Sequence, residues 1–430
     1  MLIAAVLWAG MFAVFAASPV TQMNDSTYSM LTAQSLIQNG TPDLSRYVIP
    51  DFEASLPFWT IRGRHAYQLV RTNGRLLYGY PHGTSFLSVP FVALMNRLGV
   101  SAATRDMRFD FRGELFLQKL IAAFLSASLV TVLFGAASLV LTPGWSAAVA
   151  IGAGLGTQIW STASRGMWQH TWEIMIGSLV VYLLLAAGSN ASRIRPVLLA
   201  TLLSWMFYVR PTGAVPVIFV SAYVFAHRRS AFNVFAATGI AWLAVLVFYS
   251  LRIFGSPLPF YYYLNNDPQH VGLRIGMGLY GTLFSPSRGL FIFSPIVGWV
   301  LFVTIRFWRR LPFRSLAIMA LWTAAGILTI CVLQPQWWGG ACYGPRLLAD
   351  AVPWLVLLAI LGLAAIPPDR RNFRNPVVAV GALLLLTSIA MNACGALSPE
   401  TMDWNFRGRS PDIMLDWSRP QFLAGWIDRQ

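Results

Sequence analysis

The chain has 430 residues, of which 56% are hydrophobic and 11% are charged. Soluble domains carry about a quarter charged residues, so this composition indicates an integral membrane protein and excludes fibrous, disordered and disulfide-rich secreted chains. The net charge of +15 lies in short loops between apolar segments, which indicates a role in membrane topology and argues against nucleic-acid binding.

The first apolar segment, residues 2–17, is predicted to be a span. It ends at Ala16-Ala17-Ser18, which is weakly similar to a signal-peptidase site, but no basic residues precede it, so we expect no cleavage. Residues 19–114 are mostly polar apart from an apolar piece at 85–98. With about 14 residues, that piece is too short for a confident crossing, and we expect it to be interfacial or re-entrant.

Further apolar segments of spanning length follow along the rest of the chain. They lie at residues 115–141, 145–162, 169–188, 196–209, 213–227, 232–254, 287–306, 314–334, 349–366 and 376–397. With the first segment, they predict an all-α polytopic fold of about eleven transmembrane helices, in which residues 1–430 form a single membrane domain. No internal repeat is visible, which disfavours the commonest transporter architectures.

Clusters of arginine fall in alternate loops and predict the orientation. They are Arg193 with Arg195, Arg228 with Arg229, Arg306 with Arg309, Arg310 and Arg314, and Arg370 with Arg371 and Arg374. If these loops face the cytoplasm, the N-terminus is inside. The 19–114, 255–287 and 335–348 loops and the 398–430 tail then lie outside the inner (cytoplasmic) membrane. A crossing at 85–98 would invert every later loop, which is a further reason to reject it.

Polar residues near the spans concentrate on the predicted outer side. Asn24-Asp25-Ser26-Thr27-Tyr28 follows the first span and leads into a helical pattern that ends at Asn39-Gly40. A carboxylate at a membrane surface is well placed to act as a general base. The alternative is that Asp25 or Ser26 only caps the helix that Gly40 ends.

Two more outer segments carry polar groups. Tyr80-Pro81-His82-Gly83-Thr84 is more typical of a turn than of a site, because Pro and Gly interrupt regular structure. The segment 164–173 contains Arg165, His170 and Glu173, and the last two share a helix face. They are compatible with a metal site, but two ligands favour a hydrogen-bonded structural pair. The cysteines Cys331, Cys342 and Cys394 predict neither a zinc site nor a disulfide framework.

Three arginines, Arg210, Arg288 and Arg346, stand at outer span ends, where snorkelling to the interface is the simplest explanation for each. Arg346 differs because Trp337-Trp338-Gly339-Gly340 and Tyr343-Gly344-Pro345 precede it. These residues predict a shaped, aromatic-lined loop in which a fixed guanidinium suits a phosphate.

Taken together, these features resemble the GT-C glycosyltransferases, polytopic enzymes that take a sugar from a polyprenyl-phosphate carrier. The resemblance rests on the first span followed by Asp25 and a helix ending in Gly, the Tyr-Pro-x-Gly stretch, the number of spans and the large first outer loop. The segment Trp-x-Gly-Gly-x-x-Tyr-Gly-Pro-Arg, residues 337–346, is similar to one in bacterial members of poorly defined specificity.

The resemblance implies an inverting glycosyltransferase with Asp25 as base and an acceptor hydroxyl on a glycan, lipid or protein. It also implies that Lys119 or Arg165, and Arg346, lie near the carrier phosphate, and together with the polar residues described above this gives two sets of candidates. Candidates for the donor phosphate are Arg346, Lys119, Arg165, Arg288 and Arg210. Candidates for the substrate pocket are Tyr28, His82, His170, Glu173, Trp337, Trp338 and Tyr343.

The chain also departs from the aminoarabinose and mannosyl branches of that group. Tyr80-Pro81-His82 stands where many members have Lys-Pro-Pro, and His170 with Glu173 where they often have an acid near the third span. These differences leave the sugar and the acceptor open. No metal is required, although Mg or Mn is compatible with convergence of Asp25, His170 and Glu173.

Two other functional classes remain open. One is a transporter or flippase for a polyprenyl-linked or anionic solute, which would place its ionisable residues near the midplane of the membrane. The other is a noncatalytic assembly subunit, in which Asp25 would be only a cap. The concentration of polar residues on one side favours the enzyme.

Overall fold

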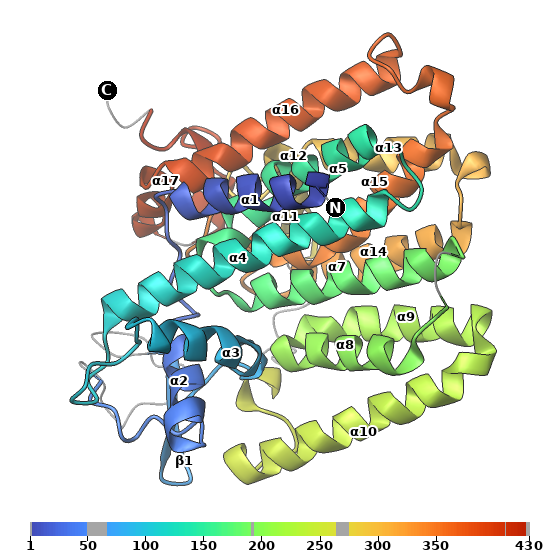
Figure 1. Ribbon diagram of the computed structural model, residues 1–430. Coiled ribbons are helices and arrows are strands. Elements are labelled where there is room, and N and C mark those ends of the chain that lie inside the picture. Colours follow the sequence, from blue (N-terminus) through green and yellow to red (C-terminus); the bar gives the residue numbers. More distant parts are fainter. Residues whose placement is uncertain (1, 50–66, 191–192, 264–274, 409, 427–430) are drawn as a thin grey trace.

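The computed structural model describes residues 2–49, 67–190, 193–263, 275–408 and 410–426 (Figure 1). Parts of the predicted 19–114 and 255–287 loops and the end of the 398–430 tail lie outside these residues. In the described part, six helical segments are long and apolar enough to cross a membrane: α4 (Phe111–Ala137), α7 (Gln169–Gly188), α10 (Arg229–Phe254), α14 (Arg314–Leu333), η6 with α15 (Arg346–Ala351 and Val352–Ala365) and α16 (Pro376–Leu397).

Shorter apolar helices complete the bundle: α1 (Leu2–Ala17), α8 (Pro196–Val209), η2 with α9 (Pro211–Gly213 and Ala214–His227), α11 (Ile275–Phe284) and α13 (Ile296–Arg306). The mostly helical membrane fold is therefore confirmed, while the number of eleven crossings stays a prediction. The other helices are α2 (Ser29–Asn39), α3 (Gly83–Arg97), α5 (Pro143–Gly156), α6 (Gln158–Ser161), α12 (Leu290–Phe293), α17 (Glu400–Asp403) and α18 (Pro411–Leu415).

The remaining elements are short. A hairpin in the first loop pairs β1 (Leu69–Thr72) with β2 (Arg75–Tyr78) as antiparallel strands. Single 3₁₀ turns connect the helices: η1 (Ala163–Arg165), η3 (Phe260–Tyr263), η5 (Trp308–Arg310), η7 (Pro368–Arg370), η8 (Trp404–Arg407) and η9 (Gln421–Leu423).

Two predicted spans are broken helices. The 145–162 segment is interrupted at Thr157, whose backbone is extended and whose hydroxyl accepts from the amide of Ile159 at the start of α6. The 287–306 segment is interrupted at Ser294 and Pro295, between α12 and α13. Proline has no amide hydrogen to continue a helix, which explains the second break.

The predicted 255–287 loop contains a helix, α11, that the sequence reading did not foresee. It packs against α14, and two of its glycines face other chain segments closely. A Cβ atom at Gly278 would lie 2.4 Å from the carbonyl oxygen of Val332, and one at Gly281 would lie 2.3 Å from the ring of Trp337. Small residues therefore allow this helix to lie directly on its neighbours.

The first loop has a folded core of its own. The short apolar piece 85–98 forms most of α3, which packs mainly against α2 and also contacts α4, α7 and α8. Side chains such as Tyr28, Leu31 and Leu117 are buried between these elements. The described part of the first loop is thereby packed against the helical bundle.

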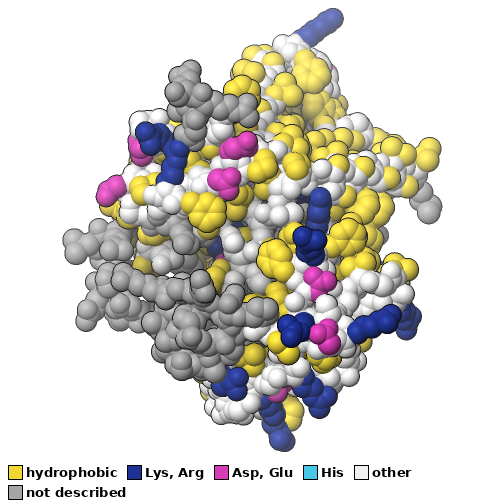
Figure 2. Space-filling model, turned by 90° about the vertical axis from the view of Figure 1, so that its left-hand side faces the viewer, with side chains coloured by type: hydrophobic (Ala, Val, Ile, Leu, Met, Phe, Trp, Pro, Cys, Tyr) yellow, Lys and Arg dark blue, Asp and Glu magenta, His cyan; other side chains and the backbone are white. Residues whose placement is uncertain are grey.

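The helices of the bundle run roughly along one direction, and the first loop and the C-terminal tail lie at the same end (Figure 1). The loops between α7 and α8, α9 and α10, α13 and α14, and α15 and α16 carry the arginine clusters and lie at the opposite end (Figure 1). Seen from the first-loop end, charged side chains of both signs are spread among hydrophobic ones (Figure 2). The loops with the arginine clusters therefore lie together at one end of the bundle, while the topology and the end that faces the cytoplasm stay predictions.

Candidate functional site

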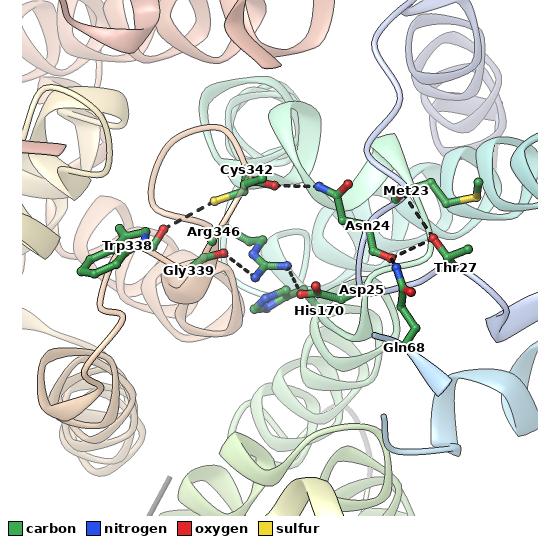
Figure 3. Close-up of polar contacts among 12 residues, drawn as sticks. Met23, Asn24, Asp25, Thr27, Gln68, His170, Trp338, Gly339, Cys342 and Arg346 are labelled. Atoms are coloured by element: carbon green, nitrogen blue, oxygen red, sulfur yellow. Dashed lines mark hydrogen bonds and ion pairs between the residues drawn. The ribbon is translucent and has the colours of Figure 1, made fainter. Parts of the chain in front are cut away.

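Asp25 lies where the first loop, the β-hairpin and the 335–348 loop meet. Its backbone carbonyl accepts from the hydroxyl of Tyr78 in β2. The side chain of the preceding Asn24 donates to the carbonyl of Ala341 (2.9 Å), and the carbonyl of Asn24 accepts from Gln68 (2.9 Å) (Figure 3). Two segments, the β-hairpin region and the 335–348 loop, thus fix the backbone on which the carboxylate stands.

The Asp25 carboxylate is paired with Arg346. Oδ2 lies 2.9 Å from Nη1 of Arg346 (Figure 3), and Oδ1 accepts from the hydroxyl of Tyr67 at 3.0 Å. The side chain of Asp25 is 29% exposed, whereas that of Arg346 is 9% exposed. The two residues that the sequence singled out most strongly, one as base and one as phosphate contact, are therefore joined in one ion pair that is open on the carboxylate side.

The helix-capping alternative for Asp25 is wrong. Helix α2 begins at Ser29, and its first free amides, those of Met30 and Leu31, donate to the Glu114 carboxylate at 3.0 and 2.8 Å. Glu114 stands in the first turn of α4 and was not foreseen as a cap, because it is 84 residues away from Met30. The other end of α2 is as predicted, since Gly40 has a left-handed φ of 66°.

Arg346 is held rigidly by the loop that precedes it. Its Nη2 donates to the carbonyl of Gly339, and its guanidinium carbon lies 4.0 Å from the ring centroid of Trp168. Gly339 and Gly340 have φ values of 70° and 74°, which residues with a side chain rarely adopt. The prediction of a shaped loop before Arg346 is in line with this geometry, and the stacked indole adds a cation–π contact.

A second charged cluster is buried beside this pair. Asp350, one helical turn after Arg346, places Oδ1 at 2.6 Å from Nδ1 of His170. Its Oδ2 accepts from the Thr212 hydroxyl at 2.9 Å and lies 2.9 Å from Nε of Arg210. Glu173 lies 3.9 Å from the same Arg210 nitrogen. This network joins the start of α7, the chain between α8 and α9, and the turn η6 that precedes α15.

Part of this cluster is predicted from the sequence. His170, Glu173 and Arg210 were candidates, and the structure brings all three together. Asp350, Thr212 and Trp168 were missed. Asp350 had a usable signal, because an acid at the start of an apolar span is functional by default.

The described residues contain no group of three or more His, Cys, Asp or Glu side chains arranged to hold a metal ion. Asp25 is paired with the guanidinium of Arg346. The described residues therefore do not show Asp25, His170 and Glu173 arranged as ligands of one metal ion.

Two of the predicted phosphate contacts bind protein carbonyls. Arg165 is buried and donates to the carbonyls of Phe15, Ser18 and Val20. It thus satisfies one free carbonyl in the last turn of α1 and two in the residues that follow the helix. Arg288 is also buried and donates to the carbonyl of Trp338 and to the side chains of Gln421 and Asn405.

Lys119, the remaining phosphate candidate, lies on α4 and is partly exposed. No ion pair joins Lys119 to any residue that the structure describes. Its ammonium group is thus available for a ligand, whereas the guanidinium groups of Arg165 and Arg288 are already used.

Several predicted pocket residues are packed into the fold. His82 donates from Nε2 to the carbonyl of Tyr78 (2.7 Å) and accepts at Nδ1 from Tyr249 (2.5 Å). Burial lowers the pKa of His82 to about 4, so its ring is neutral at pH 7. Tyr343 is buried and donates to the carbonyl of Met391. Trp337 and Trp338 pack with the C-terminal tail, and Tyr28 with Phe109.

Comparisons with known proteins place the fold. No protein-family model matches the chain, and no curated protein matches its sequence. Among solved structures, it is similar to the crystal structure of ArnT from Cupriavidus metallidurans bound to undecaprenyl phosphate, with 14% sequence identity and a TM-score of 0.51. The match covers 98% of this chain and 75% of that one. The chain therefore shares the fold of this ArnT structure, which is in line with the resemblance noted in its sequence.

Proposed function

We propose that the protein is an inverting glycosyltransferase that moves a sugar from a polyprenyl-phosphate donor to an acceptor hydroxyl. The observation that carries this proposal is the Asp25–Arg346 ion pair, in which a partly exposed carboxylate stands beside a rigid, mostly buried guanidinium. A transfer of this kind needs both groups in one site, because the proton leaves the acceptor while negative charge grows on the carrier phosphate. The ArnT fold supports the same class of enzyme.

The ion pair suggests an order of events. The donor phosphate is a better partner for the Arg346 fork than a single carboxylate oxygen, because it offers several charged acceptors. When it binds, Asp25 is released and accepts the proton of the acceptor hydroxyl. The acceptor oxygen bonds to the anomeric carbon as the bond from that carbon to the phosphate oxygen breaks. The bonding electrons stay on the phosphate, where Arg346 stabilises the added charge.

Among the other cations, we propose Lys119 as the second phosphate contact, since it has no competing ion pair in the described chain. Arg165 and Arg288 support the backbone of the loops instead. Arg210 holds Asp350 and Glu173. We further propose that the transfer requires no metal ion, because a guanidinium neighbours each of the three carboxylates, Asp25, Glu173 and Asp350, and repels a cation.

We place this site on the extracytoplasmic face of the inner membrane, because the positive-inside rule assigns the arginine-rich end to the cytoplasm. A transporter for the same lipids is the competing class. The charged cluster stands at the ends of the spanning helices, at the first-loop end of the bundle, and not at their midpoints. That position favours chemistry at a surface over passage through the midplane.

The test is to incubate the purified protein with a panel of polyprenyl-phosphate sugars and an envelope-glycan fraction as acceptor. Transfer, or slow hydrolysis of at least one donor that Asp25→Asn abolishes, is the expected result. Addition of EDTA should leave the rate unchanged. Movement of a labelled donor across vesicle bilayers without any cleavage would instead establish the transporter.

A further inference from the structure

Four buried nitrogen atoms on neighbouring residues, three at the start of α7 and one on the arginine that stacks on Trp168, lack a hydrogen-bond partner in the described chain. They are Nε1 of Trp168, Nε2 of Gln169, Nε2 of His170 and Nε of Arg346. Their residues are between 0% and 8% exposed. Buried polar groups in native proteins are nearly always satisfied. Four such atoms on neighbouring residues therefore indicate that a ligand supplies the partners.

The ring of His170 is fixed in one orientation. Its Nδ1 lies 2.6 Å from Oδ1 of Asp350, a carboxylate oxygen that can only accept. Nδ1 therefore carries the hydrogen, and in the neutral form of the ring Nε2 presents a lone pair. Thr212 and Arg210 hold the other oxygen of Asp350, so the acid cannot turn away. The unpartnered Nε2 is thus a hydrogen-bond acceptor that the surrounding network orients.

The chemistry of the four atoms restricts the ligand. Trp168, Gln169 and Arg346 offer N–H donors, whereas His170 offers an acceptor. A phosphate diester carries no hydrogen to donate and satisfies only the first three. A hydroxylated group both donates and accepts, and so is the kind of ligand that suits the acceptor on His170 as well as the neighbouring donors.

We infer that Nε2 of His170 accepts a hydrogen bond from a hydroxyl group of the transferred sugar, and that the start of α7 forms the sugar part of the donor site. This inference rests on the proposed function. It also agrees with the arrangement of Arg346, whose guanidinium stacks on Trp168 and reaches Asp25 with Nη1. A sugar is bonded directly to its carrier phosphate, so its pocket must adjoin the phosphate contact.

The test compares two substitutions of His170. In His170→Asn, the amide N–H replaces Nδ1–H toward Asp350, but no group stands at the Nε2 position. In His170→Gln, the longer side chain brings an amide oxygen to that position as an acceptor. Affinities for an accepted polyprenyl-phosphate sugar and for undecaprenyl phosphate without sugar are measured for both variants and the wild type.

We expect His170→Asn to bind the sugar-bearing donor about threefold to tenfold more weakly, the effect of one hydrogen bond. Its affinity for undecaprenyl phosphate should not change, and His170→Gln should recover part of the loss. In the wild type, one singly deoxygenated donor should lose the same factor. The same analogue should lose nothing further in His170→Asn, because the two changes remove one contact.

Equal weakening for undecaprenyl phosphate and for the donor would overturn the inference, since it would place His170 at the phosphate or in the scaffold alone. Unchanged affinity for both would overturn it as well, as would a wild type that binds sugar-bearing donors no more tightly than undecaprenyl phosphate. Failure of the proposed function has a different signature, namely a wild type that neither transfers nor hydrolyses any donor.

Discussion

Replacement of Asp25 by Asn separates the roles of the carboxylate most sharply. Asp25 does not cap α2, because Glu114 accepts from the free amides of that helix. The substitution therefore removes only the ion pair with Arg346 and the proton acceptor. The amide is of nearly the same size and can still accept from the hydroxyl of Tyr67.

The structure predicts opposite effects on rate and on binding. Loss of the base should lower the transfer rate by about a hundredfold to ten-thousandfold, or about 3–5 kcal/mol of activation free energy. Affinity for undecaprenyl phosphate should be unchanged or higher, because Asp25 no longer competes for Arg346. The partly exposed ion pair contributes about 1 kcal/mol, so the unfolding free energy should fall little.

The assay combines single-turnover transfer with binding of undecaprenyl phosphate and thermal unfolding in detergent. Tyr67→Phe is the matched control, because it removes one hydrogen bond to Asp25 and keeps the carboxylate. It should slow transfer by about tenfold at most. A fully active Asn variant would refute the role of Asp25 as base. A slow variant that also loses affinity for undecaprenyl phosphate would refute the competition between Asp25 and phosphate.

Three further predictions concern Arg346, the orientation of the chain in the membrane and His82. Arg346→Ala should weaken binding of every polyprenyl-phosphate sugar by about tenfold to a hundredfold. Arg346→Lys should weaken binding less but measurably, because the planar fork of the guanidinium is lost. Wild-type affinity in both variants, measured by titration, would remove Arg346 from the site. In a Cys394→Ser background, a membrane-impermeant thiol reagent applied to intact cells should label Ser45→Cys in the first loop and not Arg310→Cys; the reverse pattern would invert the orientation. Because the pKa of His82 is lowered from an ordinary value of about 6.5 to about 4, the unfolded chain binds more protons between these values. The unfolding free energy should therefore fall by about 3 kcal/mol as the pH drops through that window, and the fall should shrink by that amount in His82→Gln.

The sequence by itself determined the class of fold and the most prominent residues of the site. Apolar segments must form helices in lipid, since no water is present to satisfy their backbone groups. Because of that local requirement, most of the helices could be predicted from the sequence. The arginines in alternate loops predicted which loops share an end of the bundle. Asp25 and Arg346 were also readable, because each stands in a distinctive segment at the end of a span.

Only the tertiary structure decided which of these groups meet. Asp25 and Arg346 are 321 residues apart, and His170 and Asp350 are 180 apart. Nothing in the local pattern distinguishes Arg165, which binds backbone carbonyls near the end of α1, from Arg210, which faces the carboxylate of Asp350. Charged side chains at a span end have no local partner, so the packing of the helices determines whether each one meets a backbone carbonyl, another charge or a ligand.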